Sequence, residues 1–284
     1  NRRSARQRSS HSGNPRNRAA YVNILLIGDV VGRPGRELVR KGLRALIDIH
    51  GLDFVIANAE NAAAGFGVTK DIGDTLLESG IDVLTSGNHI WDKKEVIDYI
   101  KAEPRLLRPA NYPAGVPGRG NYVAQAADGR AVGVINAMGR VFMLAIDDPF
   151  AVVLREIDAM RHRTRVIIVD FHAEATSEKI AMGWHLDGRV TAIIGTHTHV
   201  QTADERILPG GTAYITDVGM CGAFDSVIGM ERETVIRGFI SQLPRQFEVA
   251  TDNVVLQGII VDVDSQNGRA QEVRRLRIPW HADN

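Results

Sequence analysis

The sequence has only one cysteine and no long hydrophobic run. The single cysteine, Cys221, excludes a framework of internal disulfides and is typical of a reducing compartment. No apolar run approaches the length of about 18 residues that a transmembrane helix needs. Hydrophobic residues still make up 44% of the 284 residues and charged residues 24%, which is ordinary for a globular protein with a buried core. We therefore expect a cytoplasmic protein without a membrane partner.

Acidic residues are missing from the start of the chain. Residues 1–20 contain six arginines and no acid, so the rest of the chain has 28 basic and 34 acidic side chains, although the formal net charge of the whole is zero. We predict that residues 1–20 form a disordered basic tail, which lacks the apolar stretch of a secretory signal. The remaining chain shows no basic stripe, so contact with RNA is a hypothesis that concerns the tail.

Several common catalytic motifs are also absent. Gly28, Gly32 and Gly35 follow the first apolar run, but their spacing matches neither the dinucleotide-binding GxGxxG motif nor the phosphate-binding loop. There is no GxSxG elbow for a serine nucleophile. Cys221 has no recognisable partner that would activate it, and it is expected to be an inert thiol that is buried or flanked by glycine.

The first hundred residues alternate between short apolar runs and helical periodicity. Strands are expected at YVNILLIGD (21–29), DFVIANAEN (53–61) and IDVLTSGNH (81–89), and helices at residues 33–51, 69–80 and 91–102. This order is typical of a parallel sheet covered by helices on both faces.

The rest of the chain adds antiparallel hairpins. Two strands, 120–126 and 131–137, flank the turn Asp128-Gly129, and two more, 253–264 and 269–278, flank residues 265–268. Between these hairpins we expect helices at 149–163 and 177–186 and strands at 165–171, 191–195 and 211–216. No internal repeat or long linker divides the chain, so we predict one α/β domain spanning residues 21–284.

Side chains that can bind metals follow five of the predicted strands. They are Asp29, then Glu60 and Asn61, then Asn88 and His89, then His172, and finally His197 and His199. An Asp or Asn at such a position is often only a turn residue or a helix cap. However, the carboxyl ends of parallel strands meet along one edge of a sheet, which is the usual ligand crevice. Their recurrence at five strand ends therefore predicts one shared site.

The two histidines of GTHTHV raise a question of geometry. Residues i and i+2 of a strand point to the same side. If the extended backbone continued past TAIIG, His197 and His199 would converge on one point.

The mixture of imidazole and carboxylate groups indicates which metals the site would bind. Iron, manganese or zinc suit such a mixture, whereas magnesium and calcium prefer oxygen ligands. Two neighbouring cations need a bridging carboxylate, and Glu60 or Asp29 could provide it. Two metals roughly 3.5–4 Å apart can hold the attacking and leaving oxygens of an in-line displacement at phosphorus, and they generate hydroxide from water near neutral pH. Hydrolysis of a phosphate ester is therefore the expected reaction.

The ordered segments GD, NAEN, GNH, FHAEATSEK and GTHTHVQTAD resemble the calcineurin-like metallophosphoesterase superfamily. More closely, they resemble its YmdB-like branch of bacterial cytoplasmic 2′,3′-cyclic nucleotide phosphodiesterases, over residues 22–278. The resemblance implies the calcineurin-like fold, in which mixed β-sheets form a sandwich flanked by helices. It also implies a binuclear metal centre, a small cyclic nucleotide such as 2′,3′-cyclic AMP as substrate, and assembly into a homo-oligomer.

The resemblance also implies a role for each candidate residue. One metal would be bound by Asp29, Glu60 and His199, with Asn61 able to join that metal or to hold the phosphate. The other metal would be bound by Glu60, Asn88, His172 and His197, so that Glu60 is shared. His89 would lie beside the substrate, as general acid for the leaving oxygen or as a stabiliser of charge on the phosphate.

The sequence departs from the wider superfamily in two places. The usual DxH block is Asp29-Val30-Val31, and the usual bridging aspartate is Glu60. Both changes agree with the YmdB-like branch, for which iron and manganese are more strongly implied than zinc.

Three further interpretations concern residues around the site. Asp170 is expected to orient a histidine or to play a structural role at a strand end. Glu174, Thr176 and Ser177 are expected to form a helix cap, and the loop AAAGFGVT (62–69) is a candidate lid or base pocket.

Two alternative functions stay open from the sequence. One is a phosphomonoesterase or 5′-nucleotidase, which would share the metal centre. The other is a regulatory protein that senses a nucleotide or an RNA end, with weak turnover.

Overall fold

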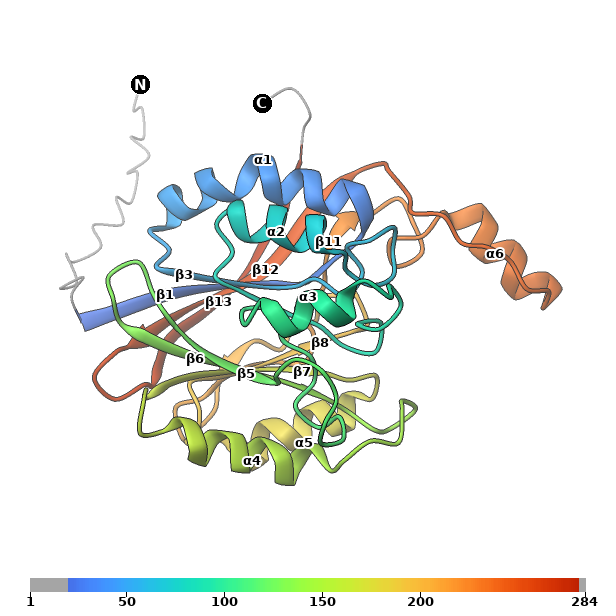
Figure 1. Cartoon of the computed structure of the whole chain (residues 1–284). Helices are drawn as coiled ribbons and strands as arrows, with labels where there is room; N and C mark the ends of the chain where they lie inside the picture. Colours follow the sequence, from blue (N-terminus) through green and yellow to red (C-terminus); the bar gives the residue numbers. More distant parts are fainter. Residues whose placement is uncertain (1–19, 281–284) are drawn as a thin grey trace, which may run out of the picture.

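The computed structural model describes residues 20–280. The predicted disordered tail therefore lies, except for Ala20, outside the described residues. Two mixed β-sheets are stacked face to face, with helices α1 and α2 on one outer side and α4 and α5 on the other (Figure 1). Helix α3 contributes Val96, Tyr99 and Ile100 to the same core cluster as α1 and α2. No helix among the described residues is both long and apolar enough to cross a membrane.

The first sheet has seven strands in the order β2-β11-β12-β1-β3-β4, with β13 paired to β12. Their bounds are β1 Tyr21–Ile27, β2 Asp29–Val30, β3 Phe54–Asn58, β4 Val83–Thr85, β11 Met220–Ala223, β12 Val254–Asp264 and β13 Ala270–Pro279. The predicted strands β1, β3 and β4 run parallel to one another. The predicted hairpin of β12 and β13 is confirmed as an antiparallel pair.

The second sheet has six strands in the order β5-β6-β7-β8-β10-β9. Their bounds are β5 Asn121–Gln125, β6 Ala131–Met138, β7 Val166–His172, β8 Ala192–Thr196, β9 Arg206–Ile207 and β10 Ala213–Ile215. The predicted hairpin of β5 and β6 is confirmed, and β6, β7, β8 and β10 are parallel.

Six helices connect the strands of the described chain. They are α1 Gly32–His50, α2 Lys70–Glu78, α3 Val96–Ala102, α4 Pro149–Met160, α5 Thr176–Leu186 and α6 Arg232–Ser241. α1 ends as predicted at Gly51, whose φ of 58° is left-handed and whose amide donates to the carbonyl of Ile47. α3 begins five residues later than predicted, because residues 91–95 form turns in which the amide of Asp92 donates to the carbonyl of His89.

The expectation of one parallel sheet with helices on both faces is wrong, whereas the mixed β-sheets flanked by helices that the family resemblance implies are present. Along β1, Leu25 and Ile27 pack against the core beneath α1, whereas Val22, Ile24 and Leu26 pack against strands of the second sheet. A strand that is apolar on both faces can be covered by a helix or by another sheet. The sequence pattern does not distinguish the two, and here the inner face is covered by a sheet.

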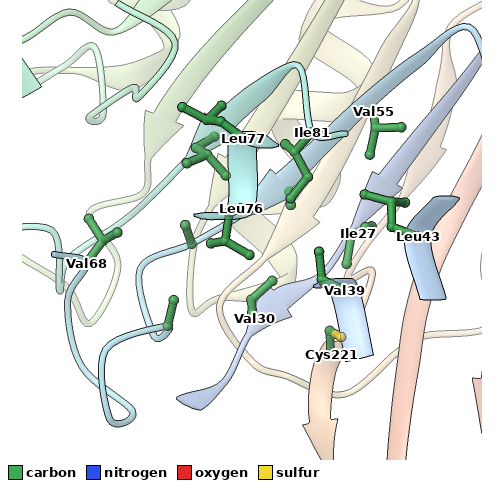
Figure 2. Packing of buried hydrophobic residues seen from close by; sticks show 14 of the residues in the cluster. Ile27, Val30, Val39, Leu43, Val55, Val68, Leu76, Leu77, Ile81 and Cys221 are labelled. Carbon is green, nitrogen blue, oxygen red and sulfur yellow. The ribbon is translucent and has the colours of Figure 1, made fainter. Parts of the chain in front are cut away.

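Cys221 belongs to the core between the first sheet and α1. Figure 2 shows it beside Val30, Val39 and Ile27. Its side chain is fully buried, as predicted, and burial raises the pKa of the thiol far above its usual range. A Cβ atom on Gly35 would lie 2.2 Å from the Cys221 carbonyl oxygen, so glycine is required where α1 meets β11.

Strands β9 and β11 and helix α6 were not predicted from the sequence. α6 projects from the body of the molecule (Figure 1), and Val235 is its only buried residue. Phe239 and Ile240 of this helix are exposed. α6 and the segment that follows it, residues 232–247, are called the α6 arm below.

Candidate metal centre

The predicted site residues do meet, at the edge where strands of both sheets end. Asp29 lies in β2, Glu60 and Asn61 follow β3, and Asn88 and His89 follow β4 in the first sheet. His172 ends β7, and His197 and His199 follow β8 in the second sheet. The shared crevice therefore belongs to two facing sheets and not to one parallel sheet.

Glu60, His172 and His197 form the centre of this group. One ligand atom from each lies within 4.8 Å of the others. His172 Nε2 is 3.0 Å from Glu60 Oε1 and 3.0 Å from His197 Nδ1. Asn88 Oδ1 lies 3.1 Å from the same nitrogen. Four side chains that can bind a metal thus point at one small volume, and Glu60 and His172 are almost completely buried.

Asp29 and His199 form a second part of the group. His199 Nε2 is 3.7 Å from Asp29 Oδ1, which is too long for a hydrogen bond. Asp29 Oδ1 and Asn61 Oδ1 are both buried without a hydrogen-bond partner. Buried oxygens without partners are costly, and a bound cation would satisfy both. The donor set of carboxylate, amide and imidazole therefore fits a metal at this position.

The backbone turns sharply at the two histidines of GTHTHV. β8 ends at Thr196, and φ is 100° at His197 and 63° at His199. Both values lie in the left-handed region that side chains rarely adopt, and such strain gathers at functional sites. The extended backbone does not continue, so the two rings diverge. His197 contacts His172, and His199 contacts Asp29.

Asp217 holds the loop that carries His197 and His199 in place, a role that was not predicted from the sequence. Its Oδ2 accepts hydrogen bonds from the amide and the hydroxyl of Thr198, at 3.0 and 2.7 Å. The same oxygen lies 2.7 Å from Lys179 Nζ, and Oδ1 accepts from the amide of Gly219. Lys179 and Asp217 are each only 1% exposed. This buried ion pair fixes the residue between the two histidines.

Replacing Asp217 with asparagine is expected to lower the free energy of unfolding by about 3–5 kcal/mol, because Lys179 would keep a buried charge without a counter-charge. Denaturant titration followed by circular dichroism would measure the change. Asp98→Asn is the matched control, since its ion pair with Lys101 is exposed and its loss should leave the midpoint unchanged. A variant Asp217→Asn as stable as the wild type would contradict this account.

Hydrogen bonds also orient His172. Its Nδ1 lies 3.0 Å from Thr196 Oγ1, and that hydroxyl donates to Asp170 Oδ1 at 2.7 Å. Asn58 Nδ2 lies 3.3 Å from the same Nδ1 and 3.4 Å from Asp170 Oδ2. Asp170 therefore acts on the histidine through Thr196 and Asn58, not by direct contact. Such outer hydrogen bonds set the ring orientation of metal-binding histidines.

Most groups of the site have pKa values that suit metal binding at neutral pH, but His172 does not. Burial opposes its charge, yet the carboxylates of Glu60 and Asp29 raise its pKa to about 9, so this imidazole must lose a proton before it binds a metal. Burial opposes ionisation of Glu60, but the charge of His172 and its hydrogen bond lower the pKa of this carboxyl. Burial and the charge of His172 lower the pKa of His197, so its ring is neutral. Burial raises the pKa of Asp29 to about 6, which still leaves it ionised above neutral pH. Ionised carboxylates and neutral imidazoles are the forms that bind metals.

His89 and Glu174 stand at the rim of the group. The backbone amide of His89 donates to Glu60 Oε2 at 3.1 Å, its Nδ1 lies 2.8 Å from Asp92 Oδ2, and its ring contacts Phe66 edge-on with centroids 5.0 Å apart. Glu174 Oε2 lies 3.0 Å from His197 Nε2. The cap predicted for Glu174, Thr176 and Ser177 is wrong, because the residue that caps α5 is Ala175, without a side-chain bond.

A cavity of about 840 Å³ opens above these residues, and we call it the metal cavity. Glu60, His89 and His199 line it, and so do Phe239 and Phe247 of the α6 arm. Phe66 of the predicted lid loop also lines it. The cavity is large enough for a nucleotide-sized ligand.

Known proteins are similar to this chain in sequence and in fold over most of its length. The YmdB-like protein family model matches residues 25–276. A 2′,3′-cyclic-nucleotide 2′-phosphodiesterase of Bacillus subtilis (strain 168) is 51% identical over 258 residues, which cover 90% of this chain and 97% of that protein.

Two crystal structures have the same fold, each with a TM-score of 0.85. One is a hypothetical protein of Thermus thermophilus, 39% identical, with 91% of this chain and 99% of that chain covered. The other is a novel phosphatase of Mycoplasma pneumoniae, 36% identical, with 91% and 94% covered. The chain belongs to the YmdB-like family.

Proposed function

We propose that this protein is a metal-dependent phosphodiesterase that hydrolyses 2′,3′-cyclic nucleotides at a binuclear centre. The observation that carries the proposal is the convergence of Glu60, His172 and His197 beside the partnerless oxygen of Asp29. The activity named for the Bacillus subtilis relative supports the substrate class. We further propose that residues 21–284 form one domain of the calcineurin-like metallophosphoesterase fold.

The two parts of the site correspond to two metal positions. We assign Asp29, Glu60 and His199, with Asn61, to one metal and Glu60, Asn88, His172 and His197 to the other. Glu60 would be a ligand of both metals; its Oε1 lies 3.0 Å from His172 Nε2, and its Oε2 accepts the amide of His89 at 3.1 Å. The mixed ligands favour iron or manganese, and two such ions supply a nucleophile from water and neutralise charge on the phosphate.

His89 is assigned to the leaving oxygen. Water adds to phosphorus, one bond from phosphorus to a ribose oxygen breaks, and that oxygen must take up a proton. His89 lines the metal cavity, and its Nδ1 lies 2.8 Å from Asp92 Oδ2, which orients the ring. A protonated His89 can donate from Nε2 to the leaving oxygen. Asn61 borders the same cavity, and contact with the phosphate is the alternative to its assignment as a metal ligand.

A phosphomonoesterase is the second candidate, and the description of the Mycoplasma pneumoniae structure as a phosphatase favours it. Substrate profiles separate the two. Manganese- or iron-loaded protein is expected to hydrolyse 2′,3′-cyclic AMP and to leave 3′-AMP and p-nitrophenyl phosphate largely intact, and a chelator should abolish turnover. Hydrolysis of the monoesters alone would replace the diesterase proposal with the monoesterase. Binding of the nucleotide without turnover would indicate a sensor.

A further inference from the structure

A second cavity borders the candidate metal centre and carries excess positive charge. It has a volume of about 1030 Å³, and we call it the basic cavity. Four basic side chains line it against one acidic side chain: Arg33, Arg36, Lys93 and Arg245 against Glu248. The first two come from the start of α1, Lys93 follows β4, and Arg245 belongs to the α6 arm.

Most of these cationic side chains form no ion pair with another described residue. Among residues 20–280, no carboxylate forms an ion pair with Arg33, Lys93 or Arg245. The guanidinium of Arg36 donates to the carbonyl of Ala62 and forms no ion pair within 4 Å among the described residues. Cations gathered in a concave surface focus positive potential and attract polyanions.

The two cavities share part of their wall. Phe66, Arg245 and Phe247 line both the metal cavity and the basic cavity. Phe66 also contacts the ring of His89, so the shared wall begins beside the residue assigned to the leaving oxygen. A ligand that leaves the metal cavity past Phe66 therefore enters a basic surface bordered by two aromatic rings.

Cations interleaved with aromatic rings are the features that bind single-stranded nucleic acid. Basic side chains follow the phosphate backbone, and bases stack on aromatic rings whatever their sequence. Small-molecule sites have volumes of about 300–1,000 Å³, so the metal cavity alone can hold a free mononucleotide. Such a substrate would not occupy the basic cavity.

We propose that the preferred substrate is an RNA whose 3′ end is a 2′,3′-cyclic phosphate. The terminal nucleotide occupies the metal cavity, and the basic cavity binds the nucleotide on its 5′ side. This inference rests on the proposed function. Arg33, Lys93 and Arg245 contact the backbone phosphates, and Phe66 and Phe247 provide the stacking surfaces. A free nucleotide with an added 5′-phosphate offers the same anionic chemistry, and the experiment includes it.

The experiment compares kcat/KM for three substrates of manganese-loaded protein. They are 2′,3′-cyclic AMP, its 5′-phosphorylated form, and a diadenosine dinucleotide that ends in a 2′,3′-cyclic phosphate. The wild type is expected to prefer the dinucleotide over 2′,3′-cyclic AMP by at least about tenfold. In the double variant Arg33→Ala/Lys93→Ala, this ratio is expected to fall toward one. Because the ratio is taken within each protein, a general loss of activity cancels.

The matched control is Arg44→Ala/Lys94→Ala. It removes the same two charges from α1 and from the segment after β4, at exposed positions outside both cavities, and it should keep the wild-type ratio. A second readout is the binding of a fluorescent oligoribonucleotide with a 3′-phosphate in the presence of a chelator. Its affinity should fall between about 50 and 200 mM salt in the wild type, and less steeply in the first double variant.

Each outcome bears on one claim. An active wild type with a ratio near one, or a first double variant that keeps the ratio, overturns the RNA inference and leaves the proposed function intact. If the 5′-phosphorylated mononucleotide matches the dinucleotide, the ligand of the basic cavity is a single phosphate and the RNA inference fails. If none of the three substrates is hydrolysed, the proposed function fails and this inference fails with it.

Discussion

Replacing Glu60 with glutamine is expected to lower kcat/KM for 2′,3′-cyclic AMP by at least about a hundredfold and to reduce the amount of metal that copurifies. The glutamine keeps the size of the side chain but removes its negative charge. The carboxyl of Glu60 is 1% exposed, contacts His172 through one oxygen and accepts the amide of His89 through the other. It is the only proposed ligand shared by both metal positions, so its loss affects both.

Two measurements separate loss of metal from loss of fold. Metal content is determined by mass spectrometry after loading with manganese, and the fold is compared by circular dichroism. Glu78→Gln, at an exposed position on α2, is the matched control and should retain full activity and metal. A Glu60→Gln variant with wild-type turnover would show that this carboxylate does not bridge a catalytic centre.

Replacing Gly87 with alanine is expected to abolish metal binding and activity although no proposed ligand is changed. A Cβ atom at this position would lie 2.1 Å from Cδ2 and 2.2 Å from Nε2 of His172, and 2.5 Å from Glu60 Oε2. His172 and Glu60 are buried, so neither can move aside without breaking the cluster. Misplacement of a catalytic group by about 1 Å can lower a rate about a hundredfold.

The matched control for Gly87 is Gly129→Ala. Gly129 has a φ of 86° in the turn between β5 and β6, and a Cβ atom there would meet nothing within 4 Å. This substitution strains the backbone by about 1 kcal/mol far from the site, so it should lower the melting temperature slightly and keep metal and activity. If Gly87→Ala binds metal like the wild type, the close packing of His172 against this backbone is not required.

That these candidate side chains lie close together could be predicted from the sequence, because they share a position at strand ends. Asp29, Glu60, Asn88 and His172 each follow or end a strand that is visible as an apolar run. The parallel strands then determine where these side chains meet, whichever way the sheet is covered. The expected meeting point of these side chains therefore did not depend on whether a helix or a second sheet covers the inner face.

The supporting residues could not be predicted, since their function depends on contacts between distant segments. Asp217 lies beyond β10 in a stretch without a motif, and only its hydrogen bonds to Thr198 show its role. Glu174 has the sequence context of a helix cap, but its carboxylate reaches His197 instead.

The basic cavity is likewise invisible in the sequence. Arg33, Lys93 and Arg245 are separated by long stretches of chain, and acidic residues such as Glu37 and Asp92 lie close to them in sequence. No run of basic residues results, so the body of the chain was judged to lack a basic surface. The α6 arm was missed for a related reason, because only one of its helical residues contributes to a buried face.

The candidate centre lies between two sheets, so its formation depends on the folding of both. The amide of His197 donates to Asp29 Oδ2 at 3.3 Å, although the two residues are 168 positions apart. Neither sheet carries a complete set of the proposed ligands, so a chain in which only one sheet has formed cannot complete either proposed metal position. Metal that binds only the native state would stabilise it by mass action and would hold the two sheets together. We therefore expect activity only in molecules in which both sheets have formed and packed against each other.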